Sequence, residues 1–92
     1  MKCDRNEHGV IQYPHSDDRR LLVLLAAIDE LERATLTTLA EFTGLNKGVI
    51  PRNVEILREQ FGVEIEKDGP VYSLVSWGPL LKKGGVKKLL RG

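Results

Sequence analysis

Side chains that could bind a metal or act in catalysis are concentrated near the N-terminus, where Cys3, Asp4, His8 and His15 occur. Thiolate, carboxylate and imidazole groups are ligands that zinc accepts. Their spacing matches no standard zinc motif, and neither histidine stands in a recognisable pattern with Cys3 or a serine that would indicate a nucleophile and its base. The chain also has no glycine-rich phosphate loop in a strand-to-helix context. We therefore predict no metal site, no cofactor and no enzymatic activity.

The C-terminal end carries a second kind of chemistry, a cluster of cations. Residues 76–92 contain five basic and no acidic residues, whereas residues 1–75 contain nine basic and 13 acidic residues, although the net charge is only +1. The five cations are Lys82, Lys83, Lys87, Lys88 and Arg91. Such side chains neutralise phosphates without reading a base sequence. The tail is predicted either to contact phosphates or to pack on the acidic body, and Gly84–Gly85 argues against one continuous helix.

Length and composition limit the classes of protein that can carry these residues. A chain of 92 residues with 41% hydrophobic and 29% charged residues is expected to form one globular domain, too small for a large enzyme cleft. The single cysteine cannot form an internal disulfide, which favours a reducing cytoplasm. The longest apolar run, Leu21–Ile28, is too short to span a membrane, and the opening residues lack a signal-peptide core. We expect a cytoplasmic protein without membrane contact.

A first helix is predicted from about Asp17 to Arg33. Ser16 is a suitable N-cap, Asp17 and Asp18 suit the positive end of the helix dipole, and apolar residues then recur at helical spacing. The apolar stripe is wide, which implies contact on more than one side. The neighbours are either the rest of a small core or a second subunit.

A second and a third helix are predicted after it. Thr37 is suited to cap the second helix, and Gly44 is suited to end it because glycine favours the C′ position. Pro51 in the interior of the third helix would cost about 3 kcal/mol, since proline removes a backbone hydrogen bond and its ring meets a carbonyl. We therefore predict an irregular or 3₁₀ turn over residues 46–49 and regular helix from near Pro51 to Gly62.

Beyond Gly62 the spacing changes from helical to strand-like. Val63–Glu66 alternates, Asp68-Gly69 is a turn signal, and Val71–Val75 supplies a second strand, so a β-hairpin is predicted. Trp77-Gly78-Pro79 then interrupts the pattern before the basic tail. We predict an N-terminal arm over residues 1–15, a folded domain over 16–79 and the tail over 80–92.

Three helices followed by a hairpin is the element order of a winged helix, a mainly α fold with a small β-hairpin. In that fold the second and third helices form a helix-turn-helix and the hairpin is the wing. Small Ala40 allows the two helices to cross closely, and Gly44 permits the tight turn between them. The alternative is an ordinary helical hairpin with a glycine turn, which would leave the β-hairpin unexplained.

Residues 17–77 resemble the winged helix-turn-helix superfamily of prokaryotic transcription regulators. A narrower resemblance is carried by Thr43-Gly44-Leu45 and by Tyr72–Leu80. These residues are similar to a family of small prokaryotic winged-helix proteins, of undefined cellular role, whose wing runs into a Trp-Gly-Pro sequence. The resemblance implies the fold and DNA binding, and it implies no operator, ligand or catalytic residue.

By this resemblance the early positions of the third helix would enter the major groove of duplex DNA. Arg52 is suited to bind guanine with two hydrogen bonds and Asn53 to reach adenine, while Lys47 would meet a phosphate. Lys67 at the tip of the wing and the five tail cations are further candidates for phosphate contact. Five carboxylates on the same helix and wing oppose this assignment: Glu55, Glu59, Glu64, Glu66 and Asp68.

The sequence therefore predicts a winged-helix protein that binds duplex DNA and regulates transcription. A homodimer is expected, from the wide apolar stripe of the first helix and because such domains gain specificity through paired half-sites. The alternative function is a winged-helix module for protein–protein interaction that does not bind DNA. The five carboxylates favour that alternative.

Overall fold

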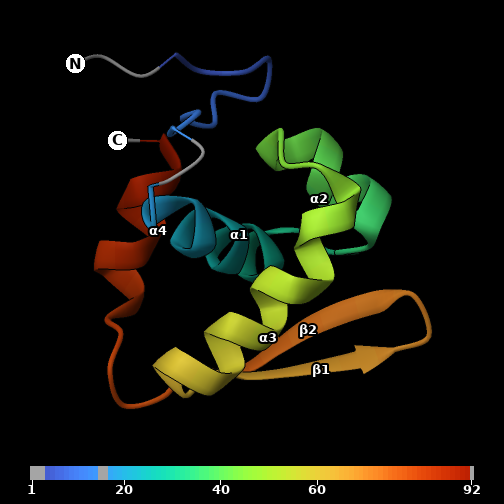
Figure 1. Ribbon diagram of the computed structural model, residues 1–92, viewed down its shortest axis with the longest axis vertical. Helices are drawn as coiled ribbons and strands as arrows, with labels where there is room; N and C mark the ends of the chain where they lie inside the picture. The colour runs from blue at the N-terminus through green and yellow to red at the C-terminus, as the bar shows by residue number, and fades with distance from the viewer. Residues whose placement is uncertain (1–3, 15–16, 92) are drawn as a thin grey trace.

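Helix α1 (Arg19–Glu30) lies at the centre of the fold, and each of its residues from Val23 to Ile28 is buried (Figure 1). The computed structural model describes residues 4–14 and 17–91. Helices α2, α3 and α4 and strand β2 all pack against α1. The wide apolar stripe is thus covered within one chain, and it gives no indication of a second subunit.

The first helix begins at Arg19, two residues later than predicted, and it ends earlier than predicted. Asp18 occupies the N-cap position without a side-chain cap hydrogen bond, and the Asp17 carboxylate accepts a hydrogen bond from the Arg19 backbone N–H at 2.9 Å. The predicted cap Ser16 lies outside the described residues. The helix ends at Glu30, because Leu31 has an extended backbone. The predicted end at Arg33 is wrong: the chain must turn there to let the Ala34 carbonyl accept a hydrogen bond from the Tyr72 N–H of the hairpin.

Helix α2 (Leu36–Thr43) is capped by Thr35, so the prediction of Thr37 as the cap is wrong. The Thr35 hydroxyl accepts from the Thr38 N–H at 3.1 Å, and the Thr38 hydroxyl accepts from the Thr35 N–H at 2.8 Å. This reciprocal pair satisfies two backbone donors at once. The predicted end is confirmed, because Gly44 has a positive φ of 79° and terminates the helix.

The predicted disturbance around Pro51 is confirmed. A single 3₁₀ turn, η1 (Lys47–Val49), precedes α3 (Ile50–Phe61), and Pro51 falls in the first turn of α3, where its missing N–H costs nothing. The Asn46 side chain accepts from the Gly48 N–H at 2.8 Å and caps η1. Gly62, with φ of 68°, ends α3 as expected.

Strands β1 (Glu64–Asp68) and β2 (Val71–Ser76) form the predicted antiparallel hairpin. Asp68 pairs with Val71, which leaves a two-residue loop of Gly69 and Pro70. Gly69 has a positive φ of 58°, and proline holds φ near −65°, the signs that a type II′ turn requires. Figure 1 shows the tip of this hairpin projecting away from the helices.

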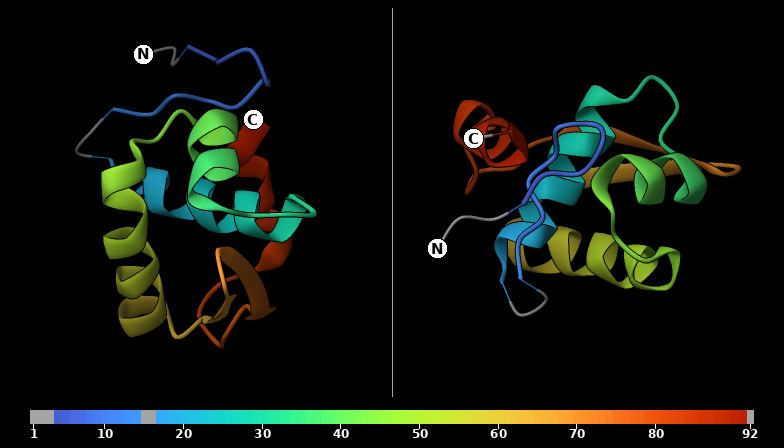
Figure 2. Two further views of the ribbon diagram at one scale, coloured as in Figure 1. Left: turned by 90° about the vertical axis from the view of Figure 1, so that its right-hand side faces the viewer. Right: turned by 90° about the horizontal axis from the view of Figure 1, so that it is seen from above.

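The C-terminal segment forms helix α4 (Lys83–Arg91), which packs against α1 and crosses it steeply (Figure 2). The helix runs through Gly84 and Gly85, so the expectation that this pair would interrupt it is wrong. Both glycines lie in the first turn of α4 and not in its interior, where each would cost about 1 kcal/mol. Burial of Val86 and Leu90 in the core with α1 stabilises the helix, since tertiary packing supplies most of the stability of short helices.

Residues 4–14 contain no helix, but they are held tightly between the C-terminal ends of α2 and α4 (Figure 2). The Ile11 N–H donates to the Leu90 carbonyl at 2.9 Å, and the Gln12 side-chain amide donates to the Thr43 carbonyl at 2.9 Å. Val10 is fully buried. The arm therefore satisfies carbonyls that have no partner inside their own helices. Over the described ranges, no helix has the length and apolar character that crossing a membrane requires.

Candidate nucleic-acid interface

The exposed surface at the start of α3 is formed by Lys47, Gly48, Val49 and Arg52. Asn53, the remaining predicted base contact, is half-buried. The cap at Asn46 and the position of Pro51 fix this surface, because together they place η1 directly before the first turn of the helix. The structure therefore brings Lys47, Arg52 and Asn53 to one end of α3.

Helical geometry sets the direction in which each of these side chains leaves α3. Successive residues are turned by about 100°, so Arg52 lies roughly opposite the buried residues Ile50 and Val54 and faces away from the core. Asn53 leaves on the flank away from the hairpin, whereas Pro51 and Glu55 line the hollow beside the hairpin. The predicted guanine-binding and adenine-binding residues thus point to adjacent parts of the surface.

The cations at this end of α3 are not neutralised by neighbours. Among residues 4–14 and 17–91, no carboxylate lies within ion-pair distance of Lys47 or Arg52. Arg58, two turns further along, does pair with Glu55, at 3.0 Å. The uncompensated positive charge is therefore confined to η1 and the first turn of α3.

A hollow of about 590 Å³ lies between α3 and β1, with a second hollow of about 460 Å³ beside it, and we call the two together the α3–β1 groove. Val54, Ile65 and Tyr72, each at most 6% exposed, form its apolar floor. Five carboxylates and two cations also line it: Glu55, Glu59, Glu64, Glu66, Asp68, Arg58 and Lys67. The groove therefore has an excess of negative charge.

Lys67 lies across this groove from the start of α3. Its ammonium group lies 5.4 Å from the centre of the Tyr72 ring, and its neighbours in the strand are Glu66 and Asp68. Burial raises the pKa of the Tyr72 hydroxyl, and the nearby negative charge of Glu55 raises it further. The structure thus does not join Lys67 to Lys47 and Arg52 in one continuous basic surface.

The five predicted cations of the tail divide into two groups. Lys87 pairs with Asp29 of α1 at 3.1 Å, and Arg91 donates to both carboxylate oxygens of Glu30 at 2.8 and 2.9 Å. The other three, Lys82, Lys83 and Lys88, are exposed and have no ion-pair partner in the described part of the chain. Packing of the tail on the acidic body, one of the two predicted alternatives, is therefore the arrangement in this structure.

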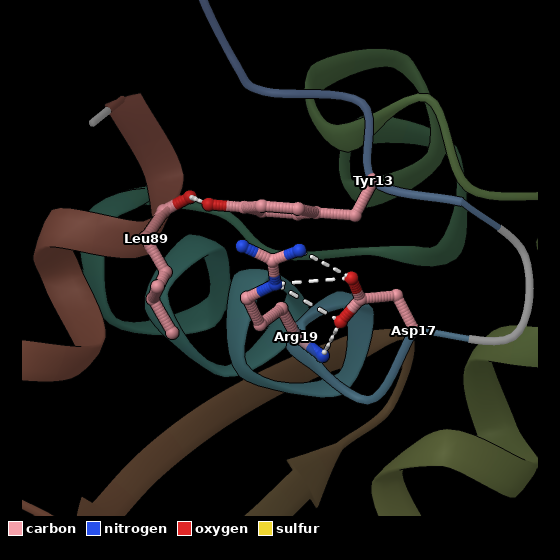
Figure 3. A network of polar contacts seen from close by, with 4 residues as sticks. All are labelled: Tyr13, Asp17, Arg19 and Leu89. Carbon is pink, nitrogen blue, oxygen red and sulfur yellow. Dashed lines mark hydrogen bonds and ion pairs between the residues drawn. The ribbon is translucent and has the colours of Figure 1, made fainter. Parts of the chain in front are cut away.

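A polar network that the sequence did not indicate joins the arm to both α1 and α4 (Figure 3). The Tyr13 hydroxyl donates to the Leu89 carbonyl at 2.8 Å, and the Arg19 guanidinium lies 4.3 Å from the centre of the Tyr13 ring. Arg19 also binds the Asp17 carboxylate, and these hydrogen bonds hold the pKa of Asp17 below its ordinary value. The network fixes the arm against α1 and α4.

The cluster of possible metal ligands near the N-terminus is only partly described. Cys3 and His15 lie outside the described residues, while Asp4 and His8 are exposed. Within the described ranges, no three histidine, cysteine, aspartate or glutamate side chains are grouped so that they could hold a metal ion.

Comparison with known proteins gives no family assignment. No protein-family model matches the chain, and neither the curated proteins nor the solved structures contain a significant match. Any function must therefore be argued from the side chains themselves.

Proposed function

We propose that this protein is a cytoplasmic winged-helix transcription regulator that binds duplex DNA through η1 and the first turn of α3. The observation that carries the proposal is the uncompensated pair Lys47 and Arg52 at the start of a helix, with Arg52 facing away from the core. The element order, three helices and then a two-stranded hairpin, agrees with a helix-turn-helix followed by a wing.

In this proposal the start of α3 enters the major groove. The positive end of its dipole attracts phosphate, to which Lys47 adds a full charge. Arg52 donates two hydrogen bonds to a guanine edge, and Asn53 reaches a neighbouring base on the flank away from the hairpin. Because α3 starts only at Ile50, the surface that faces DNA is short.

The remaining predicted contacts rank below these in expected strength. The carboxylates of the α3–β1 groove repel phosphates, so Lys67 contributes less than Lys47 or Arg52. Lys82, Lys83 and Lys88 are available to phosphates, whereas Lys87 and Arg91 would first have to leave their carboxylate partners on α1.

The excess of carboxylates in the α3–β1 groove favours a second candidate function, a module that binds other proteins and never contacts DNA. The two functions differ in their response to salt. A phosphate-binding surface loses affinity with a log–log slope of about 0.9 per phosphate neutralised.

The test is fluorescence anisotropy with a labelled random-sequence duplex over a salt series, using the full chain. The Lys47→Ala/Arg52→Ala variant is expected to bind about tenfold more weakly at low salt, with a salt slope lower by roughly one to two. The Arg33→Ala/Arg58→Ala variant removes the same charge elsewhere on the surface and serves as the control. Absence of binding at low salt, or equal losses in both variants, would contradict the proposal.

The contribution of the tail is tested by substitution. A chain ending at Gly78 would lose the buried residues Val86 and Leu90, so its failure to bind would reflect unfolding. The Lys82→Ala/Lys83→Ala/Lys88→Ala variant keeps the core, and it is expected to lower affinity equally for all duplex sequences.

A further inference from the structure

Two surfaces of opposite charge are left without partners by this fold. One is the α3–β1 groove, and the other is the segment between β2 and α4, residues 77–82, which we call the C-terminal loop. Leu80 in this loop is 66% exposed, the highest value among the large hydrophobic residues described as exposed. Lys82 and the adjoining Lys83 at the start of α4 are also exposed, and among the described residues neither has an ion-pair partner.

The α3–β1 groove has the complementary composition. Glu64, Glu66 and Asp68 alternate along β1 with the inward-facing Ile65, so carboxylates flank an apolar surface. Of the five carboxylates that line the groove, only Glu55 pairs with a cation in the described part of the chain. An exposed apolar residue followed by two lysines matches this surface in both hydrophobicity and charge.

The two surfaces adjoin each other. Gly78 packs so closely on the end of α3 that a Cβ atom there would lie 2.5 Å from the Gly62 carbonyl oxygen. Val63 and Glu64, which follow Gly62 directly, line one end of the groove. Because the loop is anchored beside the groove, a two-fold rotation can bring the loop of each copy to the groove of the other.

We propose that two copies of this chain associate by such a two-fold contact, in which the C-terminal loop of each copy lies in the α3–β1 groove of the other. Leu80 packs against Val54, Ile65 and Tyr72, and Lys82 and Lys83 pair with the carboxylates along β1. Because the net charge of each chain is only +1, the two copies do not repel each other strongly. Lys47 and Arg52 do not line the groove, so this contact leaves the two main cations of the proposed DNA surface free, while it occupies Lys82 and Lys83.

The experiment is sedimentation velocity on the full chain without DNA, over a concentration series at low and high salt. A dimer is expected that dissociates as salt rises. The groove variant Glu64→Lys/Glu66→Lys and the loop variant Lys82→Glu/Lys83→Glu are each expected to weaken dimerisation by at least about tenfold. All four side chains are exposed, and circular dichroism checks that both variants remain folded.

Mixing the two variants is the decisive step. The groove variant carries positive charge on both surfaces and the loop variant negative charge on both, so a reciprocal contact predicts that the mixture forms a heterodimer. Arg33→Glu/Lys88→Glu, which changes exposed cations outside both surfaces, is the matched control and is expected to dimerise normally. Three results would overturn the proposal: a monomer at every concentration in low salt, dimerisation of both charge-reversal variants as strong as that of the unmodified chain, or a mixture of the two variants that stays monomeric. If the chain is a monomer at every concentration, the groove is instead suited to bind a cationic segment of another protein.

Discussion

On the α1–α4 side of the molecule, two of the five tail cations are paired with carboxylates of α1: Lys87 with Asp29 and Arg91 with Glu30. On the side formed by α3 and the hairpin, Lys47, Arg52 and most carboxylates of the α3–β1 groove are exposed without a partner in the described residues. Both sides are strongly charged. The difference indicates that ion pairs hold α4 against α1 on the first side, whereas most charges on the second side remain available to other molecules.

Apolar burial should separate the two sides most clearly. Leu90 of α4 is fully buried, so Leu90→Ala is expected to lower the free energy of unfolding by about 3 kcal/mol, through lost transfer energy and a cavity. Leu80→Ala, in the exposed C-terminal loop, is expected to change it by less than about 0.5 kcal/mol. Urea denaturation of both variants measures the difference. A loss at Leu90 as small as the one expected at Leu80 would show that α4 is not part of the core.

Removal of one hydroxyl on each side gives the next largest contrast. Tyr13→Phe deletes the hydrogen bond to the Leu89 carbonyl and should cost about 1 kcal/mol. Tyr72→Phe deletes a hydroxyl for which the structure shows no hydrogen bond among the described residues, and it should be close to neutral. Thermal unfolding of the two variants provides the comparison. A larger loss of stability in Tyr72→Phe than in Tyr13→Phe would contradict the assignment of a stabilising hydrogen bond to Tyr13 alone.

Neutralising single carboxylates should have a smaller effect. Asp29→Asn breaks the pair with Lys87, which is partly exposed, and is expected to cost about 0.5 kcal/mol at low salt. Glu66→Gln removes an unpaired charge from a negative surface and should be neutral or slightly stabilising. A double-mutant cycle with Lys87→Met measures the coupling of the first pair, and coupling indistinguishable from zero would mean that the pair does not stabilise α4.

Titration gives the smallest expected effects. The pKa of Asp17 lies below its usual value because of hydrogen bonds from Arg19. The ionised Asp17 carboxylate therefore stabilises the fold above about pH 4, and this stabilisation is lost as pH falls through the lowered pKa. The pKa of Tyr72 lies above its usual value, so its contribution is present below about pH 10 and is lost as pH rises. NMR titration should show the Asp17 pKa rising in Arg19→Met and the Tyr72 pKa falling in Glu55→Gln. An unchanged pKa would show that Arg19 does not lower the pKa of Asp17, or that Glu55 does not raise the pKa of Tyr72.

Local signals in the sequence predicted much of the α3–hairpin side. Pro51 and Gly62 set the limits of α3 because each acts on its own backbone, and Gly69 determines the turn in the same way. With these limits, helical geometry places Lys47 and Arg52 at the exposed start of α3. The excess of carboxylates along the hairpin was also visible as composition, although the apolar surface between them was not.

The α1–α4 side could not be predicted in the same way, because its determinants are distant in sequence. Continuity of α4 through Gly84 depends on burial of Val86 and Leu90 against a helix more than fifty residues earlier. The choice of Thr35 rather than Thr37 as a cap depends on where the chain turns to meet β2. The bond from Tyr13 to the Leu89 carbonyl spans almost the whole chain. Spacing within a segment does not contain such information.

The most direct test of the central claim, that the unpaired charges at the start of α3 bind DNA, is NMR of backbone amides during titration with a duplex at low salt. We predict that the largest shift changes occur at residues 46–53 and that amides of α4 from Lys87 to Arg91 change little. Changes confined to α4, or no change at any residue, would contradict this account.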